Sequence, residues 1–284
     1  MKNRHPELLI PASSLEVLKT AVMFGADAVY IGGEAFGLRA KAKNFSMEDM
    51  KEGVRFAHEH GARVHVTVNI LAHNDDLQGA AEYLKELKEI APDALIIADP
   101  AIFMLAKEIC PEIERHVSTQ ANNTNYGTFN FWWNLGAKRV VTARELSLKE
   151  IKEIRAHIPE DMEIESFIHG AMCISYSGRC LLSNFFTARD ANQGACTHPC
   201  RWKYSVVEET RPGEYMPVYE NERGTYIFNS KDLCMIEHIP EMIDAGIDSF
   251  KIEGRMKIAL YVATGARTYR KAMDDYLEDP KKYE

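Results

Sequence analysis

The chain has 284 residues, of which 46% are hydrophobic and 27% charged, and its formal net charge is −8. This composition is typical of an ordinary globular protein, and the negative charge argues against a broadly basic nucleic-acid-binding surface. No apolar run approaches the roughly 20 residues that cross a bilayer, and the N-terminus carries no recognisable signal peptide. We therefore expect a cytoplasmic protein that does not associate with membranes.

The first half of the chain alternates short apolar runs with longer amphipathic ones. For example, RVHVTVNI precedes DLQGAAEYLKELKEIAP. Short runs rich in Val and Ile are typical of strands buried on both faces, and the longer runs have helical spacing. Eight strand–helix units, the last ending in a helix near residues 259–279, predict a single (β/α)8 barrel domain over residues 1–284. An open doubly wound sheet is the alternative.

The alternation is interrupted once, between the seventh strand and the seventh helix. This insertion covers about residues 171–230 and contains YSVVEE and YMPVYENERGTYIFN, which predict short strands around a turn at Arg211, Pro212 and Gly213. In a barrel, the segment after a strand leaves from the C-terminal face, where active sites lie. The insertion should therefore cover the barrel mouth.

Five of the six cysteines fall in or just after this insertion. Structural disulfides are rare in the cytosol, so a metal or cluster site is the better interpretation. The spacings fit neither the CxxC pairs of zinc ribbons nor the tight runs of bacterial ferredoxins. Iron–sulfur is favoured, with zinc or free redox thiols as alternatives. The five are Cys173, Cys180, Cys196, Cys200 and Cys234, the last expected at the start of a helix.

Polar residues at the ends of the predicted strands form a second set of candidates. Strand periodicity places Glu165, Phe167 and His169 on one face, and it does the same for Lys251, Glu253 and Arg255. If both sets point inward, they converge near the cysteines. The alternative is that they form internal ion pairs, such as Glu165 with Lys251 or Glu253 with Arg255. The catalytic candidates are Glu165, His169, Glu253 and Arg255, and the substrate-binding candidates are Arg144, Lys251, Gln120 and Asn122.

Four segments resemble a known family in order and spacing. These are ESFIHGAMCISYSGRCLLS, NQGACTHPCRW, FNSKDLC and KIEGRMK. They are similar to the collagenase-like peptidases of unknown catalytic type, and the resemblance covers essentially the whole chain. Within that family the chain looks closest to the branch implicated in 5-hydroxyuridine formation at the tRNA wobble position. Sister branches hydroxylate a ribosomal RNA cytidine or support oxygen-independent ubiquinone hydroxylation.

The resemblance implies a 4Fe–4S cluster held by Cys173, Cys180, Cys196 and Cys234, with Cys200 as an alternative ligand. It also implies tRNA as substrate and a dicarboxylate such as prephenate as oxygen donor. Arg144, Lys251 and Arg255 would then clamp the donor's carboxylates. A protein partner or a homo-oligomer is also implied. Members of this branch continue into a C-terminal domain, which we expect to be absent here.

Three functions follow as hypotheses. The first is hydroxylation of a tRNA wobble uridine with an iron–sulfur cluster. The second is the peptidase activity of the family label, although the sequence has no GxSxG and no HExxH motif. The third is an iron–sulfur subunit of another oxygen-independent hydroxylation system.

Overall fold

The computed structural model describes residues 5–37, 44–202, 205–207, 209–217, 232–281 and 283. Eight parallel strands form its centre: β1 (Glu7–Pro11), β2 (Ala28–Gly32), β3 (Arg63–Val68), β4 (Ala94–Ile97), β5 (Glu114–Val117), β6 (Arg139–Val141), β7 (Glu163–Gly170) and β11 (Ser249–Ile252). Each strand pairs with its neighbours around a ring that β7 closes by pairing with both β6 and β11. The predicted (β/α)8 barrel is confirmed, and the open sheet is excluded.

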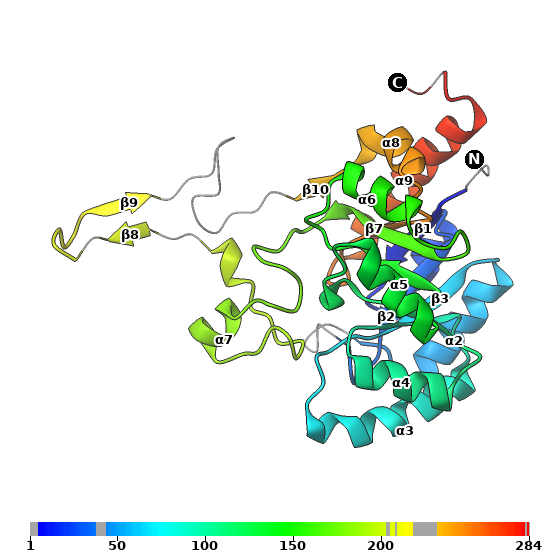
Figure 1. Cartoon of the computed structure of the whole chain (residues 1–284), viewed down its shortest axis with the longest axis horizontal. Helices are drawn as coiled ribbons and strands as arrows, with labels where there is room; N and C mark the ends of the chain where they lie inside the picture. Colours follow the sequence, from blue (N-terminus) through cyan, green and yellow to red (C-terminus); the bar gives the residue numbers. More distant parts are fainter. Residues whose placement is uncertain are drawn as a thin grey trace.

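Helices surround the barrel, as Figure 1 shows. They are α1 (Leu15–Met23), α2 (Met47–Glu59), α3 (Asn74–Ile90), α4 (Pro100–Ile109), α5 (Tyr126–Leu135), α6 (Leu148–Ala156), α8 (Ile239–Asp244) and α9 (Ala259–Glu278). Several begin where a side chain accepts a hydrogen bond from a free backbone N–H of the first turn, as Ser46 does for α2 and Ser147 for α6. None of the described helices is long and apolar enough to cross a membrane.

The strands are buried on both faces, which explains why their sequences are nearly continuous apolar runs. Their outward side chains pack against the helices in one large core that includes Phe250 of β11 and Phe103 of α4. Their inward side chains fill the barrel itself. Leu9, Tyr30 and Ile96 form a small apolar cluster there with Ala28.

The strand registers arrange the inward side chains in layers of four, taken from alternate strands as in other barrels of this type. From the N-terminal end upward, the layers are Glu7, Arg63, Glu114 and Glu163; then Ala28, Ala94, Arg139 and Ser249; then Leu9, His65, His116 and Glu165; then Tyr30, Ile96, Val141 and Lys251. Charged residues therefore occupy positions that are usually apolar.

Arg139 connects these layers. Its guanidinium lies 2.5 Å from Glu7 Oε1, 2.7 Å from Glu163 Oε2 and 3.2 Å from Glu165 Oε2. Glu165 also accepts from Lys251 Nζ at 2.6 Å. Buried charges are tolerated only when they are paired in this way, so the network ties the β1, β6, β7 and β11 strands together.

The insertion after β7 contains α7 (Leu182–Thr187), a 3-10 turn (Pro199–Arg201) and an antiparallel hairpin of β8 (Ser205–Val207) and β9 (Tyr215–Pro217). The hairpin extends away from the barrel (Figure 1). The two short strands are therefore confirmed with the turn between them. The rest of the predicted second strand, and the end of the insertion near residue 230, fall at 218–231, outside the described residues.

The expectation that Cys234 begins a helix is wrong. Leu233–Cys234 forms β10, which pairs antiparallel with β7 at Gly170 and His169, and the helix starts at Ile239. The reason is the length of β6. It pairs with β7 only at residues 163–165, so β10 can pair with the end of β7.

We predict that Glu7→Gln destabilises the protein by about 3 kcal/mol at neutral pH, since it breaks a buried ion pair. Burial alone would raise the pKa of Glu7, but the charge of Arg139 and the hydrogen bond from it hold the pKa well below the usual 4.5. A carboxyl with a lowered folded pKa stabilises the fold above its unfolded pKa and loses that effect as the pH falls. The difference between wild type and variant, measured by urea unfolding, should shrink below pH 4.5.

The matched control is Glu82→Gln, which removes an exposed carboxylate paired with Lys85 on α3. It should change stability by less than about 1 kcal/mol at either pH. An effect of Glu7→Gln as small as this control would contradict the role assigned to the Arg139 network.

Candidate active site

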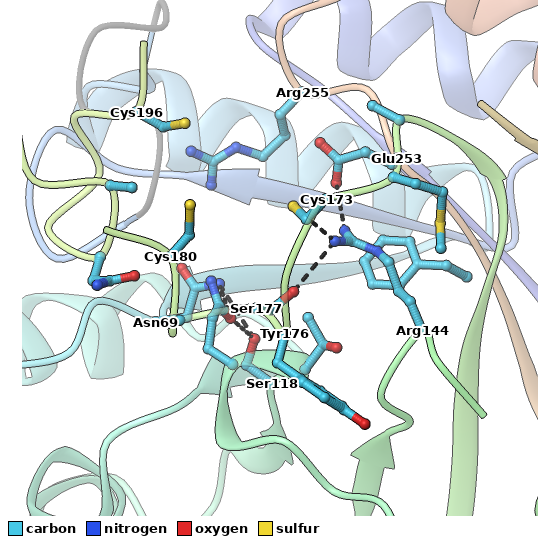
Figure 2. Close-up of a pocket in the computed structure, with 18 of the residues that line it drawn as sticks. Asn69, Ser118, Arg144, Cys173, Tyr176, Ser177, Cys180, Cys196, Glu253 and Arg255 are labelled. Carbon is cyan, nitrogen blue, oxygen red and sulfur yellow. Dashed lines mark hydrogen bonds and ion pairs between the residues drawn. The ribbon is translucent and has the colours of Figure 1, made fainter. Parts of the chain in front are cut away.

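A cavity, here called the mouth cavity, lies between the C-terminal end of the barrel and the insertion (Figure 2). Its floor is the layer of Tyr30, Ile96, Val141 and Lys251. Its walls come from the residues that follow β3, β5, β6 and β11, and its cover comes from the insertion. The prediction that the insertion covers the barrel mouth is confirmed.

Four free cysteine thiols line the mouth cavity: Cys173, Cys180, Cys196 and Cys200. Figure 2 shows the sulfurs of the first three around the same space. Burial raises the pKa of the Cys200 thiol, and the neighbouring Cys173, Cys196 and Cys180 thiols add to this rise. The Cys200 thiol is therefore close enough to the other three thiols to interact with them electrostatically.

Cys234 does not line the mouth cavity. It is exposed on β10, and its Sγ lies 3.9 Å from the hydroxyl of Tyr269 on α9. The geometry thus favours Cys200, the alternative ligand, over Cys234. The expected set with Cys234 stays a prediction, because the segment that leads into β10, residues 218–231, lies outside the described residues.

The chemistry of these side chains suits a thiolate-bound metal group. A single tetrahedral zinc with Zn–S bonds of about 2.3 Å would hold its sulfurs roughly 3.8 Å apart. Thiolates are also the usual ligands of iron–sulfur clusters. Four thiols around one cavity are therefore compatible with either kind of metal group.

Arg144 joins the barrel to the insertion. Its guanidinium donates to Cys173 Sγ at 3.4 Å and to Ser177 Oγ at 3.2 Å, and it lies 3.7 Å from Glu253 Oε2. The same group sits 4.1 Å from the ring centre of Phe167 on β7. A planar guanidinium suits this combination of stacking and fork-like hydrogen bonding, which an ammonium group does not reproduce.

Cations predominate among the charged residues that line the mouth cavity. Its charged lining residues are Arg144, Arg201, Lys251, Glu253 and Arg255, so cations outnumber carboxylates. Lys251 lies 4.5 Å from the ring centre of Tyr30, and Arg255 donates to Thr67 Oγ1. Three of these cations, Arg144, Lys251 and Arg255, are buried or nearly so, and cations at the mouth of a barrel favour binding of an anionic ligand.

A group of uncharged polar side chains also lines the mouth cavity. Asn69 Nδ2 donates to Ser118 Oγ at 3.3 Å and to Gln120 Oε1 at 3.1 Å, and Ser118 also donates to Gln120. All three are buried. Such amide and hydroxyl groups in a mainly apolar cavity are the kind that fix a ligand's orientation.

The structure separates the predicted site residues into two groups. Glu253, Arg255, Arg144, Lys251 and Gln120 line the mouth cavity together with the cysteines. Asn122 instead holds the insertion in place: it donates to the carbonyl of Ser177 at 2.8 Å and accepts from Arg179 Nε at 2.8 Å.

Glu165 and His169 do not line the mouth cavity. Glu165 lies one layer below the floor and pairs with Lys251, so the internal ion pair is the correct interpretation for these two residues. The expectation that His169 shares the inward face is wrong. The β7–β11 register shifts between Lys251 and Ile252, and His169 packs against Tyr261 and Tyr269 of α9.

Several inward-facing polar residues were missed from the sequence, among them His65, His116 and Ser118. Each occupies an alternate position in an otherwise apolar strand or directly after it, in RVHVTV and ERHVS. The sequence signal that could have identified them is the polar residue at every second position of these segments.

A family model described as Peptidase family U32 matches residues 13–284. The chain therefore belongs to this family, as the resemblance implied. The U32 peptidase Mk0906 has a solved structure with a TM-score of 0.57 and 17% identity, covering 88% of this chain and 94% of that one. At this identity, the likeness establishes the fold alone.

Curated relatives are more similar in sequence. The tRNA hydroxylation protein P1 of Bacillus subtilis is 49% identical over 280 residues, which is 99% of this chain and 66% of that protein. The tRNA hydroxylation protein P of Escherichia coli is 44% identical over 309 residues, which is 95% of this chain and 68% of that protein. The chain thus spans about two thirds of the length of these relatives.

We predict that Gly178→Ala loosens the loop that carries Cys173 and Cys180. Gly178 has φ +73°, and an added Cβ would lie 3.2 Å from Gln120 Cβ. A left-handed backbone costs a residue with a Cβ about 1–2 kcal/mol, so loop opening should become about 5- to 30-fold more frequent. Labelling of Cys180, which is only partly exposed, by a disulfide reagent should accelerate accordingly in the metal-free protein.

The control is Gly213→Ala in the β8–β9 turn. It has φ +91° but nothing within 4 Å of the added Cβ. In this control variant, the mouth-cavity thiols should be labelled at the same rate as in the wild type. Equal labelling rates in Gly178→Ala and wild type would show that this loop is not held by its contact with Gln120.

Proposed function

We propose that this chain carries the catalytic barrel of an RNA hydroxylase, which adds an oxygen atom to C5 of the wobble uridine of tRNA. The observation that carries the proposal is the mouth cavity, where four thiols face a wall rich in cations. The relatives named as tRNA hydroxylation proteins match the chain over nearly its full length, which supports RNA as the substrate class.

The proposed cofactor is a 4Fe–4S cluster. Cys173, Cys180 and Cys196 would hold it, with Cys200 or Cys234 as the fourth ligand. When bound, such a cluster would supply a redox or substrate-activating centre at the cavity wall. Arg144 would then donate a hydrogen bond to one ligand sulfur, since it already contacts Cys173 Sγ. Hydrogen bonds to ligand sulfurs tune the potential of a cluster.

The proposed oxygen donor is a small dicarboxylate of the prephenate type. Converting a C–H bond to C–OH is a two-electron oxidation, so the donor must supply both the oxygen atom and the oxidising equivalents. Arg144, Lys251 and Arg255 provide the cations that would hold two carboxylates, and each is buried or nearly so. A charged pair of this kind is stronger where water is excluded.

The target base would enter the mouth cavity unstacked. Enzymes that react with a base act on single-stranded nucleic acid or extrude the nucleotide, and the anticodon loop already presents unpaired bases. The Asn69, Ser118 and Gln120 group offers both donors and acceptors for the edge of a uracil ring. These side chains would then orient C5 toward the cluster and the donor.

The geometry gives less support to the peptidase activity that the family name suggests. A cysteine peptidase needs a histidine that activates the thiol, and His169, four residues before Cys173, is one candidate for that role. His169 contacts Tyr261 and Tyr269 instead and does not line the mouth cavity. His198 does line it, but its contact with Cys196 Sγ, at 3.4 Å, is made by its backbone N–H. The iron–sulfur subunit of another hydroxylation system is the remaining alternative; activity of the purified chain alone on tRNA would exclude it.

The direct test is an anaerobic assay with purified protein, unmodified tRNA and prephenate. Nucleoside mass spectrometry should find a uridine that is one oxygen atom heavier at the wobble position. If the product forms only with another RNA, that RNA is the substrate and tRNA is not. Cleavage of peptides at a rate that survives replacement of the cavity cysteines by serine would contradict the proposal.

We predict that Cys173→Ser, Cys180→Ser and Cys196→Ser each abolish iron and sulfide binding in protein purified without air. Because a 4Fe–4S cluster requires four thiolates, loss of one ligand should remove most of the iron. Comparing Cys200→Ser with Cys234→Ser identifies the fourth ligand. The buried Cys110, which donates to the Ala106 carbonyl on α4, is the control. If the wild-type protein contained stoichiometric zinc and no iron, the assignment of an iron–sulfur cluster would be wrong.

We predict that Arg255→Met raises the KM for the dicarboxylate donor by about 10- to 100-fold, because a hydrogen bond to a charged group contributes about 1.5–3 kcal/mol. The change in kcat should be smaller. Arg270→Met is the control, since Arg270 pairs with Asp27 and Asp274 and does not line the mouth cavity. An unchanged KM with a lowered kcat would show that Arg255 does not bind the donor.

A further inference from the structure

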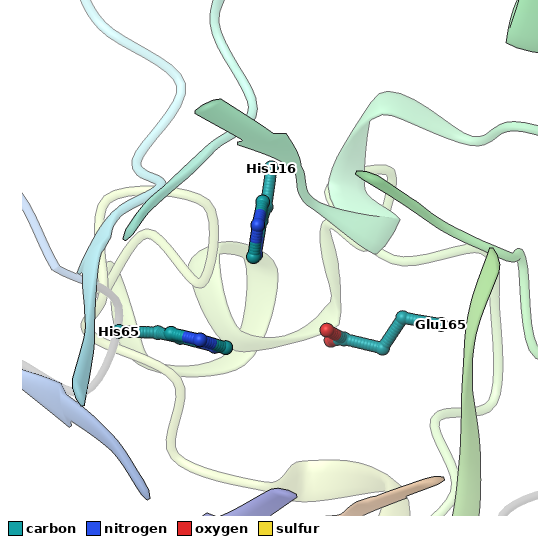
Figure 3. Close-up of side chains that lie close together, drawn as sticks. All are labelled: His65, His116 and Glu165. Carbon is teal, nitrogen blue, oxygen red and sulfur yellow. The ribbon is translucent and has the colours of Figure 1, made fainter. Parts of the chain in front are cut away.

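A second cluster of metal-binding side chains lies inside the barrel, one layer below the floor of the mouth cavity. His65 of β3, His116 of β5 and Glu165 of β7 share this layer with Leu9. One potential ligand atom from each of the three lies within 4.8 Å of the others. Figure 3 shows their side chains converging on one point from three strands.

The two imidazoles have unsatisfied nitrogen atoms. Both ring nitrogens of His65 and Nδ1 of His116 are buried without a hydrogen-bond partner in the described structure. Leaving a buried polar atom unsatisfied costs about 1–3 kcal/mol, so such atoms usually contact water or an ion. Burial holds the pKa of both histidines well below the usual value, so their imidazoles are neutral and keep a free lone pair.

The tautomer of His116 is fixed by its partner. Nε2 lies 3.1 Å from Glu114 Oε2, which as a carboxylate can only accept, so the proton is on Nε2 and the lone pair on Nδ1. A carboxylate on the far nitrogen is the usual arrangement behind a metal-binding histidine, since it orients the ring and raises its basicity.

Two cations already contact Glu165, and they are the strongest opposing interaction. Lys251 Nζ lies 2.6 Å from Oε1 and Arg139 lies 3.2 Å from Oε2. A carboxylate has about four lone-pair sites, however, so each oxygen can accept one hydrogen bond and still bind a metal. Across the interior layers, the carboxylates of Glu7, Glu114, Glu163 and Glu165 outnumber the cations of Arg63, Arg139 and Lys251. These interior side chains therefore carry a net charge of about −1, and binding of a divalent cation would change it to about +1.

We propose that His65, His116 and Glu165 bind a divalent transition metal ion inside the barrel, separate from the thiol site. Two imidazoles and one carboxylate form a ligand set that suits zinc and ions of similar size. The floor of Tyr30, Ile96, Val141 and Lys251 closes this layer from the mouth cavity. The ion therefore stabilises the barrel and does not take part in the reaction.

The test uses full-length protein in which Cys173, Cys180, Cys196, Cys200 and Cys234 are all serine, so that no thiolate cluster can form. After equilibration with zinc and gel filtration, it should retain one zinc ion per chain. Adding His65→Gln should remove that ion, and adding His58→Gln, an exposed side chain on α2, should not. Retention of zinc by the His65 variant, or no zinc in its parent, would refute the site.

A second measurement does not depend on how the variants fold. Crystals of the wild-type protein soaked in zinc should give an anomalous peak at the zinc edge between His65, His116 and Glu165. A water molecule there in zinc-soaked crystals would overturn the proposal. Neither experiment measures hydroxylation, so the metal site and the proposed activity can fail separately.

Discussion

The parallel pairing of β7 with both β6 and β11 is the constraint on which the rest of the structure depends. It closes the barrel and fixes the inward positions of Glu165 and Phe167. It also starts the insertion at the C-terminal end of the sheet. Since β7 is longer than β6, its free edge receives β10 and returns the chain from the insertion to the barrel. The thiols reach the mouth cavity because of this arrangement.

The charged interior has a related consequence. Arg139 and Lys251 form ion pairs with carboxylates of the lower layers, and Lys251 also faces the mouth cavity. The floor of the site is thus supported by ion pairs as well as by apolar packing. Removing one member of such a network leaves its partner charged and buried, so the fold and the electrostatics of the site are coupled.

The barrel could be predicted from the sequence because each strand is short, apolar and followed by an amphipathic helix. The position of the insertion followed from the one interruption in this pattern. The details that failed depend on pairing between distant strands. Cys234 lies in a strand because β6 is short, and His169 faces α9 because the β7–β11 register shifts. No local sequence pattern encodes either fact.

The site was partly predictable for the same reason. Arg144, Lys251, Glu253 and Arg255 follow strand ends, and the topology of a barrel brings such residues together. Glu165 was in the right strand but one layer too low for the mouth cavity. His65 and His116 lie within strands, where a polar residue on the inward face becomes recognisable only once the registers are known.

The most direct test of the central claim is nucleoside mass spectrometry of tRNA from a strain that lacks the gene, grown without air. The account predicts that 5-hydroxyuridine and its derivatives disappear from the wobble position. They should return with the wild-type gene and not with one that encodes Cys173→Ser. Unchanged wobble nucleosides in the deletion strain, with no second gene of this family present, would contradict the account.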